Sequence, residues 1–180
     1  MRPLFLSALL FLPLAAQDAP APGPKPPAAA PSPAEALKKL AFLQGEWEGK
    51  GWMMFGPGQK AEFSQAETVK PGLGGSILTI EGRGTAGGRT VHHAFAVFSF
   101  DPRSGAYGMR SYLADGRVAD MKVEEVTDKG FRWSMSDGRG GTMRYTLSLG
   151  PDGRWTEVGE RSADGKAWMA FFGMELAKVR

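Results

Sequence analysis

From Glu46 to the end of the chain, apolar residues recur at every second position. Phe131, Trp133 and Met135 alternate with polar residues, and residues 143–149 repeat the pattern. Successive side chains of a β-strand point to opposite faces of a sheet, so a period of two predicts strands with one buried face. This part of the chain is therefore expected to be built from half-buried strands.

Short turn signals separate the apolar runs. Glycine follows aspartate at several of them, and Asp-Gly favours hairpins because glycine readily adopts the positive φ that a tight turn needs. The signals are Gly56-Pro57-Gly58, Pro71-Gly72, Gly87-Gly88, Asp101-Pro102, Asp115-Gly116, Asp128-Lys129-Gly130, Gly140-Gly141, Pro151-Asp152-Gly153 and Asp164-Gly165. Counting the runs between them gives about ten strands. No helical pattern between them is long enough for the crossover that parallel strands require.

The expected fold is therefore all-β: an antiparallel, up-and-down barrel of about ten strands. A meander of this length is expected to close on itself, because closure removes exposed strand edges. A barrel of about ten strands has room for a small ligand, whereas smaller barrels fill with side chains. The last run, residues 168–176, is apolar on both faces. This pattern predicts an outer cover or a subunit contact at that strand.

One short helix is predicted before the strands. Residues 32–35 read Ser-Pro-Ala-Glu, which is a capping box with proline at the first helical position. Leu37, Leu40 and Leu43 then mark one face of a helix. Gly45 is expected to end it.

The N-terminus has the pattern of a secretory signal. Arg2 is followed by an apolar run over residues 4–14, which leads into Ala15 and Ala16. The run is shorter than the roughly 20 apolar residues of a membrane-spanning helix. We therefore expect cleavage near Ala16 or Ala19 and a periplasmic or secreted protein with no permanent membrane anchor. An uncleaved anchor is the alternative.

Alanine and proline dominate the stretch that follows. Such a composition cannot bury a core, and it predicts an extended, polyproline-like spacer. The expected organisation is a signal peptide over residues 1–16, a disordered linker over residues 17–32 and a β-barrel domain over residues 33–180.

Composition excludes several function classes. Apolar residues make up 42% of the chain and charged residues 23%, as in ordinary soluble globular proteins. The net charge is +3 and no basic block occurs, so no nucleic-acid partner is expected. The chain has no cysteine, which excludes disulfides, thiol catalysis and cysteine-ligated zinc. It also has no phosphate-binding loop and no G-x-S-x-G nucleophile motif.

Residues 82–87 match the pattern G-x-G-x-x-G. A dinucleotide site would need a helix directly after the glycines, and another strand is predicted there instead. The pattern is therefore expected to be a flexible hairpin.

The start of the predicted barrel resembles that of calycin-type barrels. In lipocalins a Gly-x-Trp just after a short helix begins the first strand, and the tryptophan plugs one barrel end; here these residues are Gly45 and Trp47. The rest of the chain resembles exported bacterial lipocalin-like domains of unknown function, which are related to the fatty-acid-binding and nitrobindin barrels. The matching stretches are residues 81–85, 91–94, 99–102, 155–160 and 168–176. The resemblance implies a calycin-like barrel and leaves its activity open.

The histidines bear on the cofactor. Nitrobindin-like barrels hold haem through a histidine late in the chain, whereas this sequence has only His92 and His93, both in its middle. We therefore disfavour haem and expect no cofactor. Neighbouring strand residues point to opposite faces, so the two histidines cannot chelate one metal ion together. The resemblance favours His92 as the inward residue; a hydrogen-bonded structural histidine is the alternative.

Two carboxylates fall on apolar strand faces. Glu67 shares a face with Phe63, and Glu157 shares one with Trp155. A carboxylate on an apolar face needs a partner. Arginine is the natural one, because it pairs with carboxylates through two hydrogen bonds at once. Ordinary outward-facing charges are the alternative.

Arg110 and Arg144 are the candidate partners, and Glu81 joins them if its strand faces inward. The inward faces of Glu81, His92 and Arg110 are taken from the family resemblance, since their runs do not alternate cleanly.

We therefore predict an internal cluster that holds a small, partly apolar ligand. Its predicted members are Glu67, Glu81, His92, Arg110, Trp133, Tyr145 and Glu157. One alternative is an enzyme, a hydrolase or isomerase, that uses Glu157 and His92 in the same cavity. Another is a ligand-free barrel that acts through its outer wall, with a homodimer formed through the last strand.

Overall fold

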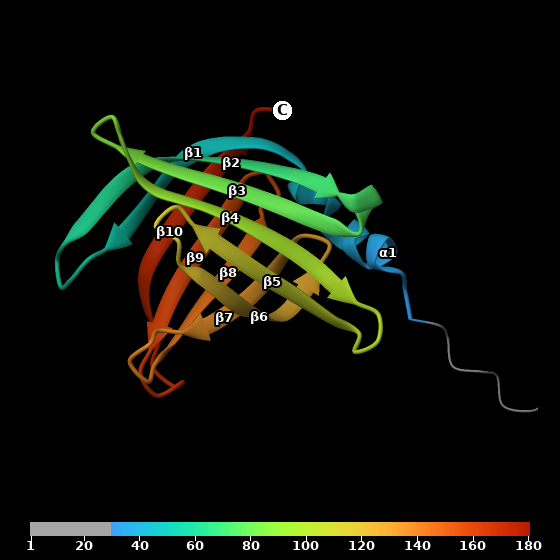
Figure 1. The fold of residues 1–180 in the computed structure, drawn as a ribbon. Coiled ribbons are helices and arrows are strands. Elements are labelled where there is room, and N and C mark those ends of the chain that lie inside the picture. The colour runs from blue at the N-terminus through green and yellow to red at the C-terminus, as the bar shows by residue number, and fades with distance from the viewer. Residues whose placement is uncertain (1–29) are drawn as a thin grey trace, which may run out of the picture.

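The structure is a computed structural model that describes residues 30–180. The predicted signal peptide and most of the predicted linker lie outside the described residues. Ten strands form one closed antiparallel barrel after a short helix, as the sequence predicts (Figure 1). The strands are β1 (Gly45–Met54), β2 (Lys60–Gly72), β3 (Ile77–Ala86), β4 (Arg89–Asp101), β5 (Ala106–Leu113), β6 (Val118–Thr127), β7 (Gly130–Ser136), β8 (Thr142–Leu149), β9 (Trp155–Ser162) and β10 (Met169–Lys178).

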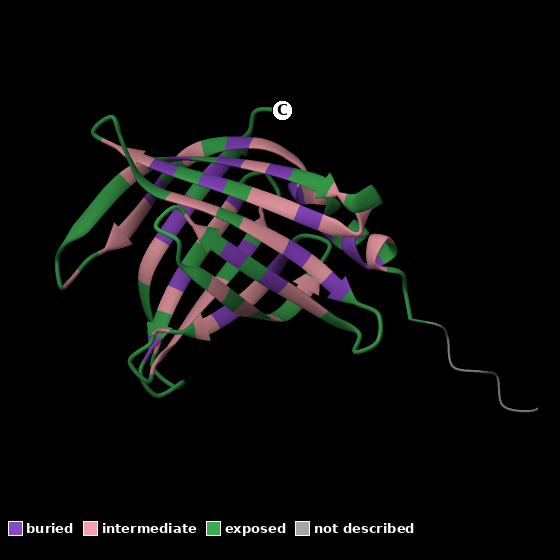
Figure 2. Cartoon of the chain, in the orientation of Figure 1, coloured by how far each residue is buried: buried purple, intermediate pink, exposed green. Residues whose placement is uncertain are grey.

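Each strand pairs with its neighbours in the chain, and β1 pairs with β10 to close the barrel. Because every pairing is antiparallel, the loops alternate between the two barrel ends. The N-terminal helix covers one end, and the β1–β2 and β3–β4 hairpins project at the other (Figure 1). We call these the closed end and the open end. Buried and exposed residues alternate along many of the strands (Figure 2), as expected of half-buried strands.

The N-terminal helix begins as predicted. Helix α1 (Pro33–Leu37) is capped by Ser32, whose hydroxyl accepts a hydrogen bond from the Glu35 amide at 3.3 Å. The Glu35 carboxylate accepts from the Ser32 amide in return, at 2.9 Å. The chain continues as a 3₁₀-helix, η1 (Lys38–Leu43), which delivers Leu40 and Leu43 to the core. Among the described residues, no helix has the length and apolar character to cross a membrane.

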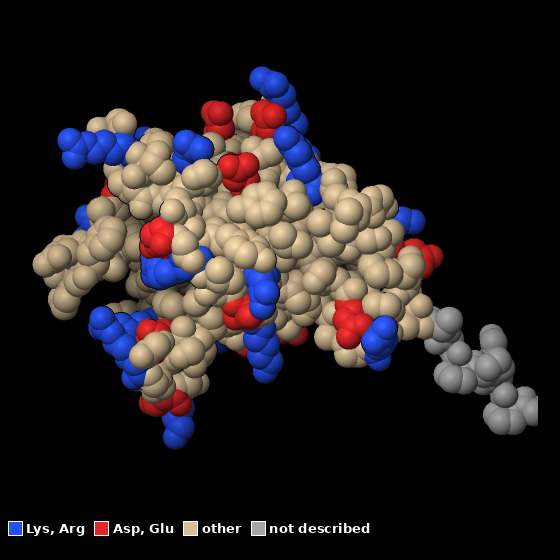
Figure 3. All heavy atoms as spheres, in the orientation of Figure 1, with Lys and Arg blue, Asp and Glu red and all other residues tan. Residues whose placement is uncertain are grey.

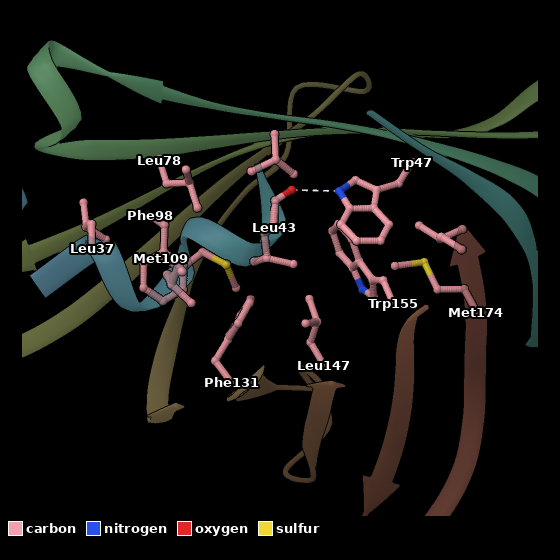
Figure 4. Close-up of a cluster of buried hydrophobic side chains, with 13 residues drawn as sticks. Leu37, Leu43, Trp47, Leu78, Phe98, Met109, Phe131, Leu147, Trp155 and Met174 are labelled. Atoms are coloured by element: carbon pink, nitrogen blue, oxygen red, sulfur yellow. Dashed lines mark hydrogen bonds between the residues drawn. The ribbon is translucent and has the colours of Figure 1, made fainter. Parts of the chain in front are cut away.

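Trp47 lies beside this helix at the start of β1. It is 1% exposed, and its indole N–H donates a hydrogen bond to the Leu43 carbonyl at 2.7 Å (Figure 4). Its ring meets Trp155 edge-on, with centroids 5.6 Å apart. The surrounding core cluster consists of Leu37, Leu40, Leu43, Val69, Leu78, Phe98, Met109, Phe131, Leu147, Trp155, Met174 and Leu176. Trp47 is therefore buried where the chain leaves the helix and enters the barrel, and its role as a plug stays a prediction.

Strand β10 departs from the predicted alternation. The register with β9 shifts between Ala170 and Phe172. Phe171 and Phe172, expected on opposite faces, both lie 5.7 Å from the Tyr145 ring because of this bulge. Because the bulge turns both Phe171 and Phe172 toward Tyr145, these two adjacent aromatic residues do not require an outer cover over β10. A homodimer through this strand stays a prediction.

Candidate binding site in the barrel lumen

The strand register decides which side chains face the lumen. Trp47 pairs with Glu67, and Glu67 pairs with Gly82. Residues paired across neighbouring strands share a face, and Trp47 is in the core, so these positions face inward. By the same rule Gln65, opposite Gly84, also faces inward.

Gln65 and Glu67 form a polar pair inside the barrel. Their exposed fractions are 5% and 8%. The Gln65 amide nitrogen donates a hydrogen bond to the Glu67 carboxyl at 2.7 Å. The Gln65 amide oxygen is buried and has no hydrogen-bond partner. Most buried polar atoms in proteins are hydrogen-bonded, so this free acceptor is an unusual feature of the lumen, together with the buried indole nitrogen of Trp155.

Glycines on β3 make room for the pair. A Cβ on Gly82 would be 2.4 Å from a Glu67 carboxyl oxygen, and one on Gly84 would be 2.9 Å from the Gln65 amide oxygen. Both side chains therefore cross the neighbouring strand at positions without side chains. The expectation that residues 82–87 form a flexible hairpin is wrong for these two glycines, which lie inside β3. The turn itself is at Gly87 and Gly88.

Glu157 faces the lumen from β9. It pairs with Met174, a core residue, and it is only partly exposed. Burial raises the pKa of Glu67 to about 7. Burial, followed by the charge of Glu67, raises the pKa of Glu157 to about 8. The two carboxyl groups therefore lie close enough to oppose each other's ionisation.

Within residues 30–180, no arginine or lysine compensates the two carboxyl groups. Among the described residues, Glu67 and Glu157 take part in no ion pair. Arg110 instead binds Asp120, with a shortest N–O distance of 2.6 Å. Arg144 binds Glu160 at 2.7 Å.

The predicted partnership of the two arginines with the lumen carboxylates is therefore wrong. The reason is the register: Arg110 follows the inward Met109 and pairs with Asp120 across the outer face. Lysine, arginine and acidic side chains are accordingly interspersed on the barrel face seen in Figure 3.

Glu81 and His92 lie on opposite sides of the wall. Glu81 precedes the inward Gly82 and so faces outward, where its carboxylate lies 2.9 Å from His93 Nε2. The prediction that Glu81 joins the cluster is wrong for this reason. His92 pairs with Gly84 and faces inward near the open end, where it keeps contact with solvent. Burial and the neighbouring His93 lower the pKa of His92.

His92 and Glu157 do not form a pair. They belong to β4 and β9, which lie on opposite sides of the ten-stranded ring. No hydrogen bond joins them in the described part of the chain. The enzyme hypothesis based on these two residues therefore has no contact to support it.

Aromatic side chains form one wall of the lumen. Trp133 stacks on Tyr145, with centroids 4.0 Å apart and an angle of 9° between the planes. Phe172 stacks on Phe63 at 6.2 Å. All four are only partly buried, unlike the buried residues of the closed end. Burial, followed by the charge of Glu157, raises the pKa of Tyr145, which places that carboxyl close to this wall.

The structure therefore brings five of the seven predicted residues to the lumen. These are Glu67, His92, Trp133, Tyr145 and Glu157. We call Gln65, Glu67, Glu157, Tyr145 and Trp133 the lumen site. Gln65 was missed by the sequence reasoning, although it shares its strand face with Phe63 and Glu67. Within residues 30–180, no three histidine, aspartate or glutamate side chains come together as a metal site.

Two open grooves lie away from the lumen site. They have volumes of about 360 and 520 Å³, run over β4, β5, β6 and the β7–β8 hairpin, and share Asp120. Asp120 already binds Arg110. Neither groove contains a residue of the lumen site, which holds the buried pair of Gln65 and Glu67.

Part of the chain is similar to a protein family of unknown function. Residues 32–113 match the sequence profile of a protein family of unknown function, DUF1579. Curated protein sequences give no match to the chain.

Two solved structures share the fold. One is Rv2717c from M. tuberculosis, with a TM-score of 0.59, 16% identity, and coverage of 82% of this chain and 99% of that one. The other is a protein of unknown function from the DUF3598 family of Nostoc punctiforme, with a TM-score of 0.52 and 14% identity. That alignment covers 78% of this chain and 49% of the Nostoc protein, so this chain spans about half of its length. The chain is thus a ten-stranded barrel whose residues 32–113, from the helix to the end of β5, are similar to DUF1579.

Proposed function

We propose that the barrel binds a small, partly apolar ligand in the accessible part of its lumen. One observation carries this proposal: the buried pair of Gln65 and Glu67 leaves the Gln65 amide oxygen without a partner. A few convergent polar groups in an otherwise apolar cavity are the usual means by which a protein orients a small ligand. A donor on the ligand would satisfy the free acceptor.

The remaining walls suit the apolar part of such a ligand. Trp133 and Tyr145 present a stacked aromatic surface, and Phe63 and Phe172 extend it toward the open end. Aromatic rings supply large contact areas at low cost in side-chain entropy. The ligand would lie with its polar end at Glu67 and its apolar part along these rings.

Two finer points belong to the same proposal. A calycin-like ligand barrel is what the Gly45 and Trp47 pattern suggests, and the placement of Trp47 at the closed end supports it. We also propose that the protein works in the periplasm or outside the cell. The support for that location is the sequence of residues 1–16, which lie outside the described part of the chain.

The test is whether the lumen retains a molecule. The protein is purified from its own host, and native mass spectrometry measures any bound mass. Ala94→Phe fills the lumen, because Ala94 pairs with Gly82 on the inward face. Ala66→Phe is the matched control, because Ala66 is exposed on the outer face of β2. A bound mass that Ala94→Phe loses and Ala66→Phe keeps would support the proposal.

The opposite result would favour a ligand-free barrel. If the wild-type protein carries no additional mass, and Ala94→Phe folds with unchanged or higher stability, the lumen has space to fill but no ligand. The circular dichroism spectrum of each variant shows whether the barrel is intact.

A further inference from the structure

We infer that the polar end of the ligand is a cation, an ammonium group carried on an apolar or aromatic body. This inference rests on the proposed function, because it names the chemical class of ligand for the same lumen site. An arginine inside the barrel would instead have favoured an anionic head group, but Arg110 and Arg144 face outward.

The charges that face the lumen site carry the argument. Glu67 and Glu157 are the acidic groups of the site, and Tyr145 stays neutral because the pKa of its hydroxyl is raised. His92 at the open end has a lowered pKa and is neutral at pH 7. When the carboxyl groups ionise, the site is therefore negative.

Two basic groups lie toward the ends of the inner wall, and neither forms an ion pair with Glu67 or Glu157 within the described residues. Arg161, toward the open end of β9, binds Asp137 with a shortest N–O distance of 2.6 Å. Lys178, at the other end of the barrel, is exposed and lies 5.3 Å from the Trp47 ring centre. An anionic ligand at the lumen site would meet two carboxyl groups that, among the described residues, have no arginine or lysine paired with them, and such a site repels it.

The free acceptors match the donors of an ammonium group. The Gln65 amide oxygen has no partner. Within the described residues, the second carboxyl oxygen of Glu67 also forms no hydrogen bond. Glu157 has a neighbouring donor in the indole N–H of Trp155, which lowers the pKa of this carboxyl group against the larger, raising effect of burial. A primary ammonium has three N–H donors. It would bind Gln65, Glu67 and Glu157 at once and supply the positive charge that the site lacks.

The aromatic wall strengthens the preference for a cation. Tyr145 is close enough to Glu157 for that carboxylate to raise its pKa. A cation held by the carboxylates is therefore also near the stacked rings of Tyr145 and Trp133. Attraction between a cation and an aromatic face contributes about 0.5–2 kcal/mol, with the higher values in desolvated sites.

A neutral ligand is distinguished by the effect of pH. A protonated carboxyl group can donate a hydrogen bond to an alcohol, so an alcohol would bind less tightly as the carboxyl groups ionise. An ammonium ion would bind more tightly over the same range, because it favours the ionised carboxylates and displaces their protons. An alkylammonium group has a pKa near that of lysine, about 10.4, and stays charged through this range.

The experiment uses three probes with the same aromatic body. Isothermal titration calorimetry measures the binding of phenethylamine, phenethyl alcohol and hydrocinnamate at pH 6 and pH 8.5. We expect phenethylamine to bind about tenfold more tightly at pH 8.5, and hydrocinnamate not to bind. The double variant Glu67→Gln, Glu157→Gln should weaken the amine about tenfold or more, as expected for charge-assisted hydrogen bonds.

Two controls separate this inference from the proposed function. Glu62→Gln changes an exposed carboxylate on the outer face of β2 and should leave all binding unchanged. Ala94→Phe should abolish binding of any probe that enters the lumen. If the alcohol or hydrocinnamate binds in a way that Ala94→Phe abolishes, and the amine does not tighten with pH, the cation is overturned while lumen binding stands. If no probe binds, the cation is overturned, and the bound mass in native mass spectrometry decides the proposed function separately.

Discussion

Glu67 lies directly over Gly82, and a single added carbon would displace it. A Cβ on Gly82 would be 2.4 Å from one carboxyl oxygen of Glu67 and 2.7 Å from the other. The space above Gly82 is therefore part of the lumen site. In the same way, the missing side chain of Gly84 leaves space for Gln65, whose amide oxygen would be 2.9 Å from a Cβ there.

Gly82→Ala is expected to destabilise the barrel by about 1–3 kcal/mol, the usual cost of overpacking a filled interior. The Glu67 carboxyl would have to move and break its hydrogen bond with Gln65. Gly108→Ala is the matched control, because the nearest atom to its Cβ would be the Ser99 hydroxyl at 3.5 Å, an ordinary contact. Urea unfolding measures both variants. Equal stability of the two would mean that Glu67 does not occupy the space over Gly82.

The stability of the ligand-free protein should fall as the pH rises from about 5 to about 9. Glu67 and Glu157 have pKa values of about 7 and about 8 in the folded protein, above the ordinary value of 4.5. The folded state therefore binds more protons than the unfolded state in this range, so the free energy of unfolding decreases with pH. Each unit of pKa difference corresponds to about 1.4 kcal/mol. The total loss is on the order of several kcal/mol.

Other groups act in the opposite direction at lower pH. The lowered pKa of His92 costs stability when the pH falls below 6.5. Turn aspartates such as Asp101 and Asp137 have lowered pKa values, and their contribution is lost on acidification. The double variant Glu67→Gln, Glu157→Gln lacks both carboxyl groups with raised pKa values. Its free energy of unfolding should therefore no longer decrease as the pH rises above 5. A wild-type protein whose urea midpoint is constant from pH 5 to pH 9 would contradict the prediction.

Trp47→Ala is expected to lower the free energy of unfolding by about 3–5 kcal/mol. The residue is 1% exposed, and its indole N–H is bonded to Leu43. Trp52→Ala is the control, because Trp52 is on the same strand but faces outward and is only half-buried. Thermal unfolding followed by circular dichroism compares them. If Trp47→Ala loses less stability than Trp52→Ala, Trp47 does not act as the plug of the closed end.

Ser32→Ala should cost about 1 kcal/mol, the typical value for a helix N-cap. Both hydrogen bonds of the capping box would be affected, and they hold the start of α1 beside the closed end. Ser148→Ala, on the outer face of β8, should change the stability by less than about 0.5 kcal/mol. A loss for Ser32→Ala no larger than this would show that the cap does not stabilise the barrel.

The fold was predictable because its signals are local. Period-two alternation and frequent turn residues determined the strands, and the capping box at Ser32 determined the helix start. The bulge near Ala170 was not predictable, because it adds a residue to one strand without changing the apolar character of the sequence. Phe171 and Phe172 consequently share a face that simple alternation assigns to only one of them.

The site was predictable only where strands alternate cleanly. Glu67 and Glu157 share faces with large apolar residues, and both lie in the lumen. Glu81, His92 and Arg110 were placed from the resemblance; His92 faces inward, whereas Glu81 and Arg110 are on the outer wall. The glycines of β3 conceal the inward face, because the inward positions after Glu81, Gly82 and Gly84, have no side chain to mark them.

The charge state of the two lumen carboxyl groups tests the account most directly. Carbon-13 NMR of the glutamate side chains follows each carboxyl group as the pH is raised, and Glu67→Gln and Glu157→Gln assign the two signals. The account predicts that both groups titrate above pH 6 in the ligand-free protein and that removing Glu67 lowers the pKa of Glu157. Titration of both groups near 4.5 would contradict it, because the carboxyl groups would then be solvated or paired with a cation and the lumen would have no uncompensated acidic site.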